Sequence, residues 1–433
     1  MIGLFDQYND MTKNLMQSLD TAGISYIPIF AQYHGELPED AICPFTYYTE
    51  TGEEGRELFF DEISVPKYCE IRQGSHVFGE VLQDGYLIGR INYRPNSFRL
   101  VQSVDWLLRD QKISRTDHYN QFGKRYGASY YHNGVPYQTV YYHGADEVIQ
   151  MNLISGFITL IYENKRYGFA NLTRFLMHFM DELELSDDRT LINSLSYPLF
   201  VSRERSLRPD TVLFWQEKIE DQLPGNMTEE LLRQKALTDI VFFNKDYLEK
   251  ARADYPSAQQ KLSYLSHIGQ FAEKHYYDKK RVFILTSSDQ IHGIEKLLGA
   301  FPELTFSVAA LTQMSGKLHG LGSEYPNLVL TPNTNQKEIR EEIKKASVYL
   351  DINGGGHVLD VVKDAYYGNL LVLALAPFAK APDYSLNYSS DDELMEVLSA
   401  AVNRDDERDK LIKELHEKQG PLSTAEDYRK LFI

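Results

Sequence analysis

The stretch that decides the fold covers residues 281–375. It opens with RVFILTSSDQIHGIEKLLGAF (281–301) and closes with SVYLDINGGGHVLDVVKDAYYGNLLVLAL (347–375). Short apolar runs alternate there with segments of helical period, which is typical of a parallel α/β unit with right-handed crossovers. We expect strands at residues 281–286, 305–310, 328–330, 347–351 and 370–375, and helices at 290–300, 337–346, 358–367 and 391–401.

The start of the chain and its third quarter show the same alternation. Residues 11–22 predict an amphipathic helix that ends at Gly23, and residues 24–30 predict a strand. Residues 191–201 and 209–215 return to helix and strand patterning after a long interruption. Helix and strand in alternation indicate one wound α/β layer that is built from both segments.

The apolar run TVLFW (211–215) ends in polar residues. In an open α/β sheet the carboxyl ends of the strands face the ligand crevice. Trp215, Gln216 and Glu217 are therefore predicted to contact a ligand, with core packing as the alternative for Trp215.

Residues 46–180 change from helical to alternating period. HVFGEVLQ and YLIGRINY flank Asp84-Gly85, and RYGASYYH and VPYQTVYYH flank Asn133-Gly134. Alternating runs around Asp-Gly or Asn-Gly are the strongest short signal for a β-hairpin. The segment predicts an antiparallel meander, which either lies on its own domain or forms a docking platform for a partner. Its histidines, at positions 76, 118, 132 and 143, lack metal-ligand spacing.

These patterns divide the chain into three parts. Residues 1–45 plus 181–260 form a first Rossmann-like domain, residues 46–180 an inserted β-sheet, and residues 261–433 a second Rossmann-like domain. The charged C-terminal helices are predicted to be a solvated outer layer of the second domain or to return to the first.

Composition excludes several classes of protein. The net charge of −17 over 433 residues disfavours binding to nucleic acid or directly to anionic lipid. The two cysteines, Cys43 and Cys69, form no CxxC pair, which indicates a reducing cytoplasm. The N-terminus lacks the basic and apolar regions of a signal peptide, and the sequence has no run of eighteen apolar residues.

Six motifs carry a resemblance to a known family. They are VQSVDWL (101–107), DHYNQFG (117–123), FWQEKIEDQLPGNM (214–227), LTSSDQIHGIE (285–295), AALTQMSGKL (309–318) and YLDINGGG (349–356). The chain resembles GT-B glycosyltransferases. More closely, it resembles the GtfB-like substrate-binding and stabilising subunit of the accessory Sec O-GlcNAc transferase complex, which glycosylates serine-rich-repeat adhesins of Gram-positive bacteria. The resemblance implies an α/β, GT-B-like pair of Rossmann-like domains with an inserted antiparallel β-meander.

The same resemblance implies a degenerate donor site. Related retaining enzymes carry Gly-Arg-Leu-x-x-x-Lys-Gly after the first strand of this half, and the two cations neutralise the donor diphosphate. With Gly293 as the last glycine, Ser287 takes the arginine position and His292 the lysine position. Of the two glutamates that these enzymes place eight residues apart, the first falls on Gly356 and the second on Asp364. A non-catalytic subunit without a cofactor, a metal or a catalytic residue is therefore expected.

Two further sets of residues are predicted to make contacts. The glycine run 354–356 predicts either a remnant anion site or the floor of a groove that a peptide approaches closely. The predicted acceptor-binding residues are Trp215, Gln216, Glu217, Asn353, Gly354 and Gly355. The predicted partner interface consists of Asp105, Trp106, Asp117 and Tyr119.

The leading hypothesis is a chaperone-like, non-catalytic subunit. It grips an unfolded Ser/Thr-rich adhesin acceptor and stabilises and activates a catalytic glycosyltransferase subunit that attaches the first GlcNAc. A two-plus-two heterotetramer in the cytoplasm is expected, with peripheral attachment to the cell membrane only through the partner. One alternative is an active retaining enzyme that uses UDP-GlcNAc, with Lys280, Arg281 or Lys317 as the replacement cation. Another is a sugar-binding module without a partner.

Overall fold

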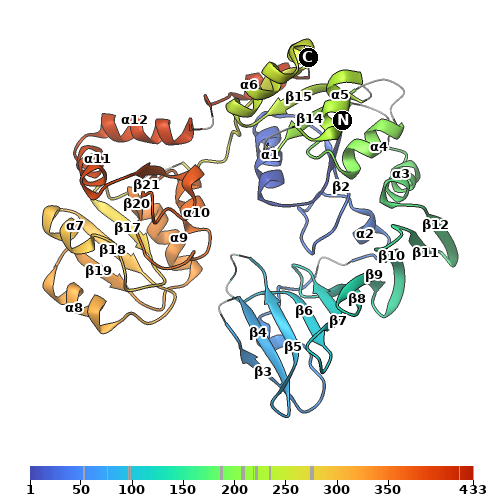
Figure 1. Ribbon diagram of the computed structural model, residues 1–433, viewed down its shortest axis with the longest axis horizontal. Coiled ribbons are helices and arrows are strands. Elements are labelled where there is room, and N and C mark those ends of the chain that lie inside the picture. The colour runs from blue at the N-terminus through green and yellow to red at the C-terminus, as the bar shows by residue number, and fades with distance from the viewer. Residues whose placement is uncertain are drawn as a thin grey trace. The chain divides into compact units, whose positions relative to one another are not determined.

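The computed structural model describes residues 1–51, 54–75, 77–95, 97, 99–185, 189–205, 210–217, 219, 223–233, 236–273, 277–418 and 420–432. His76 and part of the FWQEKIEDQLPGNM motif (residues 218 and 220–222) lie outside this described part. The chain forms two compact units (Figure 1), Met1–His267 with Ser423–Ile433, and Ile268–Leu422. Each unit is described by itself.

The first unit contains a six-stranded parallel sheet. Its strand order is β16-β15-β14-β13-β1-β2. The strands are β1 (Ile2–Phe5), β2 (Ile27–Phe30), β13 (Thr190–Ile192), β14 (Thr211–Trp215), β15 (Leu237–Phe242) and β16 (Leu262–Tyr264). The helices that accompany it are α1 (Asp10–Thr21), α2 (Pro44–Tyr47), α3 (Leu172–Glu182), α4 (Tyr197–Arg205), α5 (Gly225–Arg233), α6 (Lys245–Asp254), α13 (Ala425–Lys430) and the 3-10 turn η2 (Pro256–Lys261). The order reverses between β1 and β13, which makes their carboxyl ends the switch point where α/β proteins bind ligands.

Local signals explain α1 well. The Asn9 side chain accepts a hydrogen bond from the Thr12 backbone N–H, and Gly23 follows the helix with φ of +71°. The expected helix is confirmed. Strand β1 is a four-residue strand with every residue buried, so it has no alternation that the sequence could reveal.

The inserted region forms a ten-stranded antiparallel meander, ordered β12 to β3 without a crossover. Its strands are β3 (Cys69–Gln73), β4 (Phe78–Gln83), β5 (Tyr86–Tyr93), β6 (Val101–Leu107), β7 (Ile113–Tyr119), β8 (Arg125–His132), β9 (Val135–His143), β10 (Asp146–Asn152), β11 (Ile158–Tyr162) and β12 (Lys165–Phe169). The Asp84-Gly85 and Asn133-Gly134 hairpins are confirmed. All four of these residues have positive φ, as a type I′ turn requires.

Opposite halves of the meander are covered on different sides. Val81, Ile91 and Val104 pack under Phe60 of the 3-10 turn η1 (Phe60–Glu62). At the other half, the Tyr141 ring of β9 lies 4.4 Å from the ring of Phe45 in α2. Phe45 in turn meets Phe175 of α3 at 5.8 Å. The chain enters the meander after α2 and leaves it into α3, so aromatic packing fastens both ends of the insertion.

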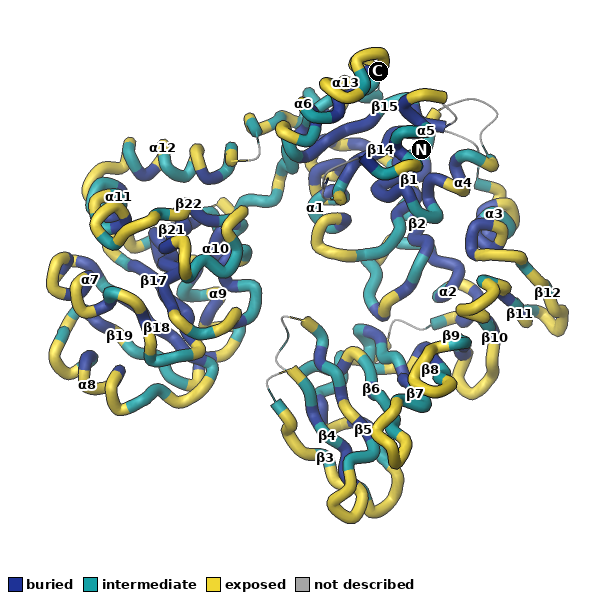
Figure 2. Tube along the Cα trace, in the orientation of Figure 1, coloured by how far each residue is buried: buried dark blue, intermediate teal, exposed yellow. Residues whose placement is uncertain are grey.

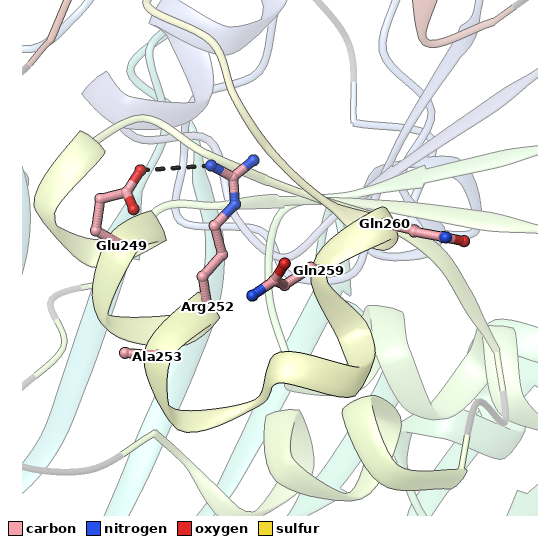
Figure 3. Close-up of a pocket in the computed structure, with 5 residues that line it drawn as sticks. All are labelled: Glu249, Arg252, Ala253, Gln259 and Gln260. Carbon is pink, nitrogen blue, oxygen red and sulfur yellow. Dashed lines mark hydrogen bonds and ion pairs between the residues drawn. The ribbon is translucent and has the colours of Figure 1, made fainter.

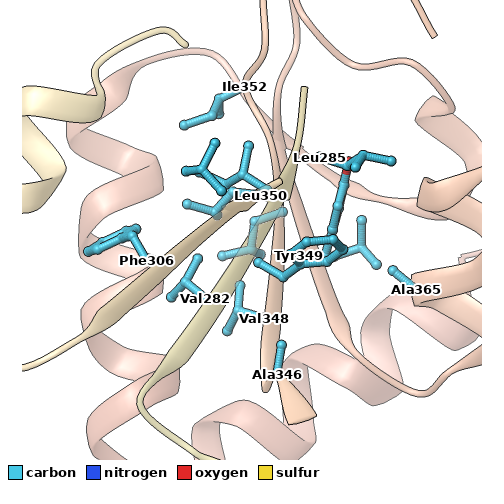
Figure 4. Packing of buried hydrophobic residues seen from close by; sticks show 14 of the residues in the cluster. Val282, Leu285, Phe306, Ala346, Val348, Tyr349, Leu350, Ile352 and Ala365 are labelled. Atoms are coloured by element: carbon cyan, nitrogen blue, oxygen red, sulfur yellow. The ribbon is translucent and has the colours of Figure 1, made fainter. Parts of the chain in front are cut away.

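The second unit contains another six-stranded parallel sheet, ordered β19-β18-β17-β20-β21-β22. Its strands are β17 (Arg281–Leu285), β18 (Thr305–Ala309), β19 (Leu328–Thr331), β20 (Val348–Asp351), β21 (Leu371–Leu375) and β22 (Leu386–Tyr388). Its helices are α7 (Ile294–Ala300), α8 (Gly316–Glu324), α9 (Gln336–Lys345), α10 (Val361–Tyr367), α11 (Asp391–Asn403), α12 (Asp405–His416) and the 3-10 turn η3 (Pro382–Tyr384). Figure 4 shows the buried side chains of β17 and β20 at the centre of its core. The GT-B-like architecture predicted from the sequence agrees with this pair of parallel sheets and the inserted meander.

One expected helix starts later than predicted. The helix expected at 290–300 begins only at Ile294, because Ile291 forms a β-bridge with Asn353 and Gly293 takes φ of +65° at the N-cap. A contact with a residue 62 positions away therefore replaces the first helical turn.

The last helix belongs to the first unit. Tyr428 of α13 is buried, its hydroxyl donates to the Ser266 carbonyl (2.9 Å), and its ring stacks on Phe214. Arg429 Nε donates to the Ala22 carbonyl (2.8 Å). The end of the chain is thus part of a core and not only a solvated layer.

We expect stability to fall in mild acid because of two half-buried histidines. His267 stacks on Phe243 at 3.9 Å and His416 on Phe271 at 3.7 Å, and burial lowers the pKa of each from 6.5 to about 4. Below pH 6.5 the unfolded chain binds more protons than the folded chain, so folding free energy is lost as pH falls toward 4. For His267 this amounts to roughly 2 kcal/mol by pH 5.

Urea unfolding at pH 7.5, 6 and 5 measures this loss. His267→Phe removes one titrating ring and should flatten the profile relative to the unchanged chain. Equal pH slopes in the two proteins would contradict the assignment to His267.

Candidate functional site

The residues predicted to form a degenerate donor site lie around the carboxyl edge of the second unit's sheet. Ser287 follows β17, and its hydroxyl donates to the carbonyl of Gly356, which follows β20 (3.2 Å). His292 Nε2 is 3.0 Å from the Asp391 carboxylate on α11, so a protonated ring already has a counter-charge. Asp364 is exposed on α10. The structure therefore brings Ser287 and Gly356 together and pairs His292 with a residue that the sequence analysis did not single out.

The loops after β17 and β20 are hydrogen-bonded to each other. His292 N–H donates to the Ile352 carbonyl (3.0 Å), and Gly354 N–H donates to the Gln290 carbonyl (2.6 Å). Gly355 N–H donates to the Asn353 side chain (2.7 Å). The backbone donors that a glycine-rich loop would offer to an anion are thus engaged at two of the three glycines. This geometry favours a close-packed turn over a remnant anion site.

Position 355 requires a glycine because the Ser287 and Asn353 side chains pack closely against its Cα. A Cβ added there would collide with the Ser287 hydroxyl and lie 2.9 Å from Asn353 Oδ1. A Cβ added at Gly356 would meet no atom within 4 Å. Of these two positions, only Gly355 therefore requires a residue without a side chain.

Asn353 and its neighbours form a buried polar cluster. Asn353 is only 3% exposed, and its carbonyl accepts a hydrogen bond from Lys380 Nζ (2.8 Å). The Lys380 N–H donates to Asp351 Oδ2 (2.5 Å), and burial raises the pKa of Asp351. The expectation that the Asn353 side chain contacts an acceptor is therefore corrected, because this side chain is internal. Lys380 was missed because it follows β21, where the sequence shows no motif.

A second polar cluster lies at the carboxyl edge of the first unit's sheet. Asn193, after β13, donates to Gln216 Oε1 (3.2 Å) and to Thr12 Oγ1 (2.9 Å), and its own Oδ1 accepts from Asp6 N–H (2.9 Å). Gln216 Nε2 donates to the Met11 carbonyl (2.8 Å). The amide of Gln216 therefore fixes the first turn of α1. Asp6 and Asn193 were missed, although each directly follows a short apolar run.

Trp215 and Glu217 differ in exposure. Trp215 is only 2% exposed, so its predicted acceptor contact is corrected to core packing. Glu217 is exposed, yet surrounding protein atoms raise the pKa of its carboxyl, and the nearby Asp6 charge adds to the rise. Glu217 and Asp6 together place two carboxylates at this edge.

Two of the predicted interface residues are held inside the meander. Asp117 is only 3% exposed and accepts from Trp106 Nε1 (2.6 Å), Arg115 (2.9 Å) and Arg125 (3.2 Å). The prediction that Asp117 contacts a partner directly is therefore corrected, because its carboxylate oxygens are bonded to side chains of three strands.

The other acidic residue of the interface set is engaged in a similar way. Asp105 accepts from Thr116 Oγ1 (2.6 Å) and Asn92 Nδ2 (2.8 Å). Trp106 and Tyr119 remain half-buried and keep part of their side chains at the surface.

A hollow of about 620 Å³ in the first unit lies away from these residues. Figure 3 shows its lining by Glu249, Arg252 and Ala253 of α6 and by Gln259 and Gln260 of η2. Since α6 starts at the carboxyl edge, its last turns and η2 lie at the amino edge. Arg252 already pairs with Glu249 (3.4 Å) and donates to the Leu262 carbonyl (3.1 Å). We therefore do not assign the ligand site here.

The described part of the chain offers neither a metal cluster nor a membrane-spanning helix. No group of three or more His, Cys, Asp or Glu side chains in that part could hold a metal ion. None of its helices is both long enough and apolar enough to cross a membrane.

Four family models match the chain in succession. They are the GtfB N-terminal domain (residues 2–48), the GtfB middle domain (69–170), the GtfB third domain (172–253) and the GftB/GlyA-F C-terminal domain (282–419). Two curated relatives named UDP-N-acetylglucosamine–peptide N-acetylglucosaminyltransferase stabilizing protein GtfB are similar to it. The Streptococcus gordonii protein is 36% identical over 86% of this chain and 84% of its own length. The Streptococcus parasanguinis protein is 33% identical over 86% of each.

Solved structures give the same result. One chain of a crystal structure of a GtfA/B complex bound to UDP and GlcNAc superposes with a TM-score of 0.89. It is 32% identical and covers 100% of this chain and 99% of its own length. The pneumococcal O-GlcNAc transferase GtfA, in complex with UDP and GlcNAc, is 14% identical with a TM-score of 0.50, over 99% of this chain and 98% of its own length. This second likeness concerns the fold alone.

Gly355→Ala and Gly356→Ala form a matched pair of substitutions. Gly355→Ala forces the Ser287 and Asn353 side chains to move, so we expect it to lower the free energy of unfolding by about 1 to 3 kcal/mol. Gly356→Ala meets open space and should stay within about 0.5 kcal/mol of the unchanged chain. Urea unfolding measures both values. Equal effects at the two positions would contradict the close-packed turn.

Proposed function

Because the chain belongs to the GtfB family of N-acetylglucosaminyltransferase stabilizing proteins, we propose that it binds a catalytic O-GlcNAc transferase subunit, activates it, and holds an unfolded Ser/Thr-rich acceptor for it. The prediction of a non-catalytic subunit is confirmed by this family membership. A two-plus-two assembly, a cytoplasmic location and membrane attachment only through the partner belong to the same proposal.

The main support for the proposal is that the side chains at the predicted donor positions of the second unit already have partners within that unit. A transferase of this fold stabilises the departing diphosphate with fixed cations. Here the two corresponding positions are Ser287, bonded to Gly356, and His292, paired with Asp391. Neither side chain supplies a permanent positive charge, so these two positions lack the fixed cations that stabilise a departing diphosphate.

The three cations considered as replacements do not change this argument. Arg281 begins β17 at the amino edge, where Glu342 holds it at 2.8 and 3.1 Å. Lys280 precedes it at the same edge. Lys317 is exposed on α8 and is the one of the three that follows a carboxyl strand end. Of these three cations, Lys317 is therefore the one whose place in the fold fits a replacement role.

The polar edge of the first unit supports acceptor binding. Hydroxyl-rich chains donate hydrogen bonds, and the carboxylates of Asp6 and Glu217 are acceptors. Gln216 contributes indirectly, because it holds the first turn of α1 beside them. Gly354 is exposed in the second unit and is retained as a predicted contact with the acceptor backbone.

The hairpin ends of the meander support docking of the catalytic subunit. Because successive strands are antiparallel, the turns after β4, β6, β8 and β10 lie at one end of the sheet. Figure 2 shows that these ends are exposed. One large apolar side chain is exposed at each of these turns, namely Tyr86, Leu108, Val135 and Ile154. Burial of exposed apolar area drives association between proteins, and Trp106 and Tyr119 lie on the same sheet.

The test is a transfer assay with radiolabelled UDP-GlcNAc and a Ser/Thr-rich acceptor polypeptide. A catalytic subunit of the GtfA type is assayed alone, this chain alone, and both together. We expect no label from this chain alone and more label from the pair than from the catalytic subunit by itself. Transfer by this chain unaided would overturn the proposal.

A variant carrying both Ser287→Ala and His292→Ala tests whether this edge of the second unit takes part in donor chemistry. Since these residues hold no donor in our account, the pair should label the acceptor within about twofold of the unchanged complex. A loss of tenfold or more, with partner binding intact by sedimentation, would assign donor chemistry to this edge after all. Lys317→Ala serves as the matching test of the replacement cation.

A further inference from the structure

The loop that follows β2, residues 31–37, joins the two sheets of the first unit. Its first half continues the ladder of the parallel sheet, since Ala31 N–H donates to Phe5 O (2.8 Å) and Gln32 N–H to Asp6 O (3.0 Å). The Gln32 side chain also donates to Asp6 Oδ1 (2.9 Å). The loop therefore begins at the polar edge where Asp6 and Glu217 lie.

The second half of the loop is bound to the meander by Gln121. The Gln121 backbone N–H donates to the Gly35 carbonyl (2.7 Å). Its side-chain amide accepts from Leu37 N–H (3.2 Å) and donates to the Leu37 carbonyl (3.3 Å). One residue of the β7–β8 turn thus makes three hydrogen bonds to the loop, as a short piece of paired strand would.

Arg94 of the meander completes this attachment. Its guanidinium donates to the Gly35 carbonyl (3.4 Å) and to the Tyr119 carbonyl (3.3 Å), and it pairs with Glu57 (3.2 Å). Glu36, between Gly35 and Leu37, reaches back to Lys13 of α1 (2.9 Å). The loop is held on one side by the meander and on the other by α1.

The approach of loop and meander is too close for a side chain at Gly35. Gly35 has φ of +89°, and a Cβ added there would lie 2.7 Å from the Tyr119 carbonyl oxygen. The neighbouring Tyr33 ring packs against Tyr126 of β8 at 4.6 Å between ring centroids. Backbone contact and ring packing leave the loop one position relative to β7 and β8.

We propose that Gln121 and Arg94 are positioning residues that couple the meander to the acceptor edge of the first sheet. This inference rests on the proposed function, in which the catalytic subunit docks on the meander. Strand β7 begins at the β6–β7 turn, one of the exposed turns assigned to docking, and at its other end it runs directly into the turn that holds the loop. A catalytic subunit bound at β6 and β7 therefore fixes the Gly35–Leu37 segment, and through it Gln32, Asp6 and the start of α1. An acceptor then meets an edge that is already ordered, which lowers the entropic cost of binding it.

The test uses the complex of this chain with its catalytic subunit. Gln121→Ala removes both side-chain bonds to Leu37, and we expect the KM for the acceptor to rise about five- to twentyfold. The affinity between the two subunits, measured by sedimentation, should stay within about twofold. The matched control is Gln150→Ala on β10, which removes an equal amide that bonds Glu147 (2.7 Å) and touches no part of the loop. The control should leave both quantities unchanged.

Two further variants decide the matter if Gln121→Ala fails to fold. Gln121→Glu keeps acceptance from Leu37 N–H and loses donation to the Leu37 carbonyl, so a smaller rise in acceptor KM is expected. Gly35→Ala leaves every meander residue unchanged, forces the loop and the Tyr119 carbonyl apart, and should reproduce the effect of Gln121→Ala. An unchanged acceptor KM in all folded variants overturns the proposal. Loss of subunit binding by Gln121→Glu also overturns it, because the residue would then belong to the docking interface.

This outcome is separable from failure of the proposed function. If the unchanged chain does not raise the activity of the catalytic subunit, the proposed function fails whatever the variants do. If the unchanged chain activates and the variants activate with the same acceptor KM, only the positioning role of Gln121 and Arg94 fails.

Discussion

The aromatic junction between the first parallel sheet and the meander is the contact on which the rest of the first unit depends. Phe45 of α2, Tyr141 of β9 and Phe175 of α3 meet there ring against ring. Elements α2 and α3 are also where the chain enters and leaves the insertion. Because aromatic rings bury a large apolar area in a fixed geometry, this junction orients ten strands at once. The loop after β2 adds a second attachment through Gln121 and Arg94.

The two parallel sheets use their carboxyl edges differently. In the second unit, loop-to-loop hydrogen bonds and the pairs Ser287–Gly356 and His292–Asp391 engage the groups of the donor positions. In the first unit, Asn193 and Gln216 organise the edge, while Glu217 stays exposed and Asp6 is partly exposed. The predicted donor positions are therefore engaged by several contacts within the unit. The polar edge that remains suits a ligand that donates many hydrogen bonds.

The meander separates the residues that hold it together from those that can meet a partner. Asp117 and Asp105 are engaged by neighbouring strands and give the sheet its internal order. The hairpin ends expose apolar side chains such as Tyr86 and Val135. A buried ion pair fixes geometry better than it adds stability, whereas exposed apolar area provides the driving force for association. This division is consistent with the proposal that one sheet is both a rigid connector and a docking surface.

The sequence by itself determined the hairpins at Asp84-Gly85 and Asn133-Gly134 and the strands β17 to β21 of the second sheet, because turn chemistry and periodicity are local properties. Strand β22 and helix α8 were not predicted from it. Only the tertiary structure decided that Trp215, Asn353 and Asp117 are buried, since burial depends on which distant segments fold over a residue. The same holds for the late start of α7 and for the partner of His292, which lies 99 positions away. Strand β1 was not predicted, because four consecutive buried residues show no alternation of apolar and polar side chains.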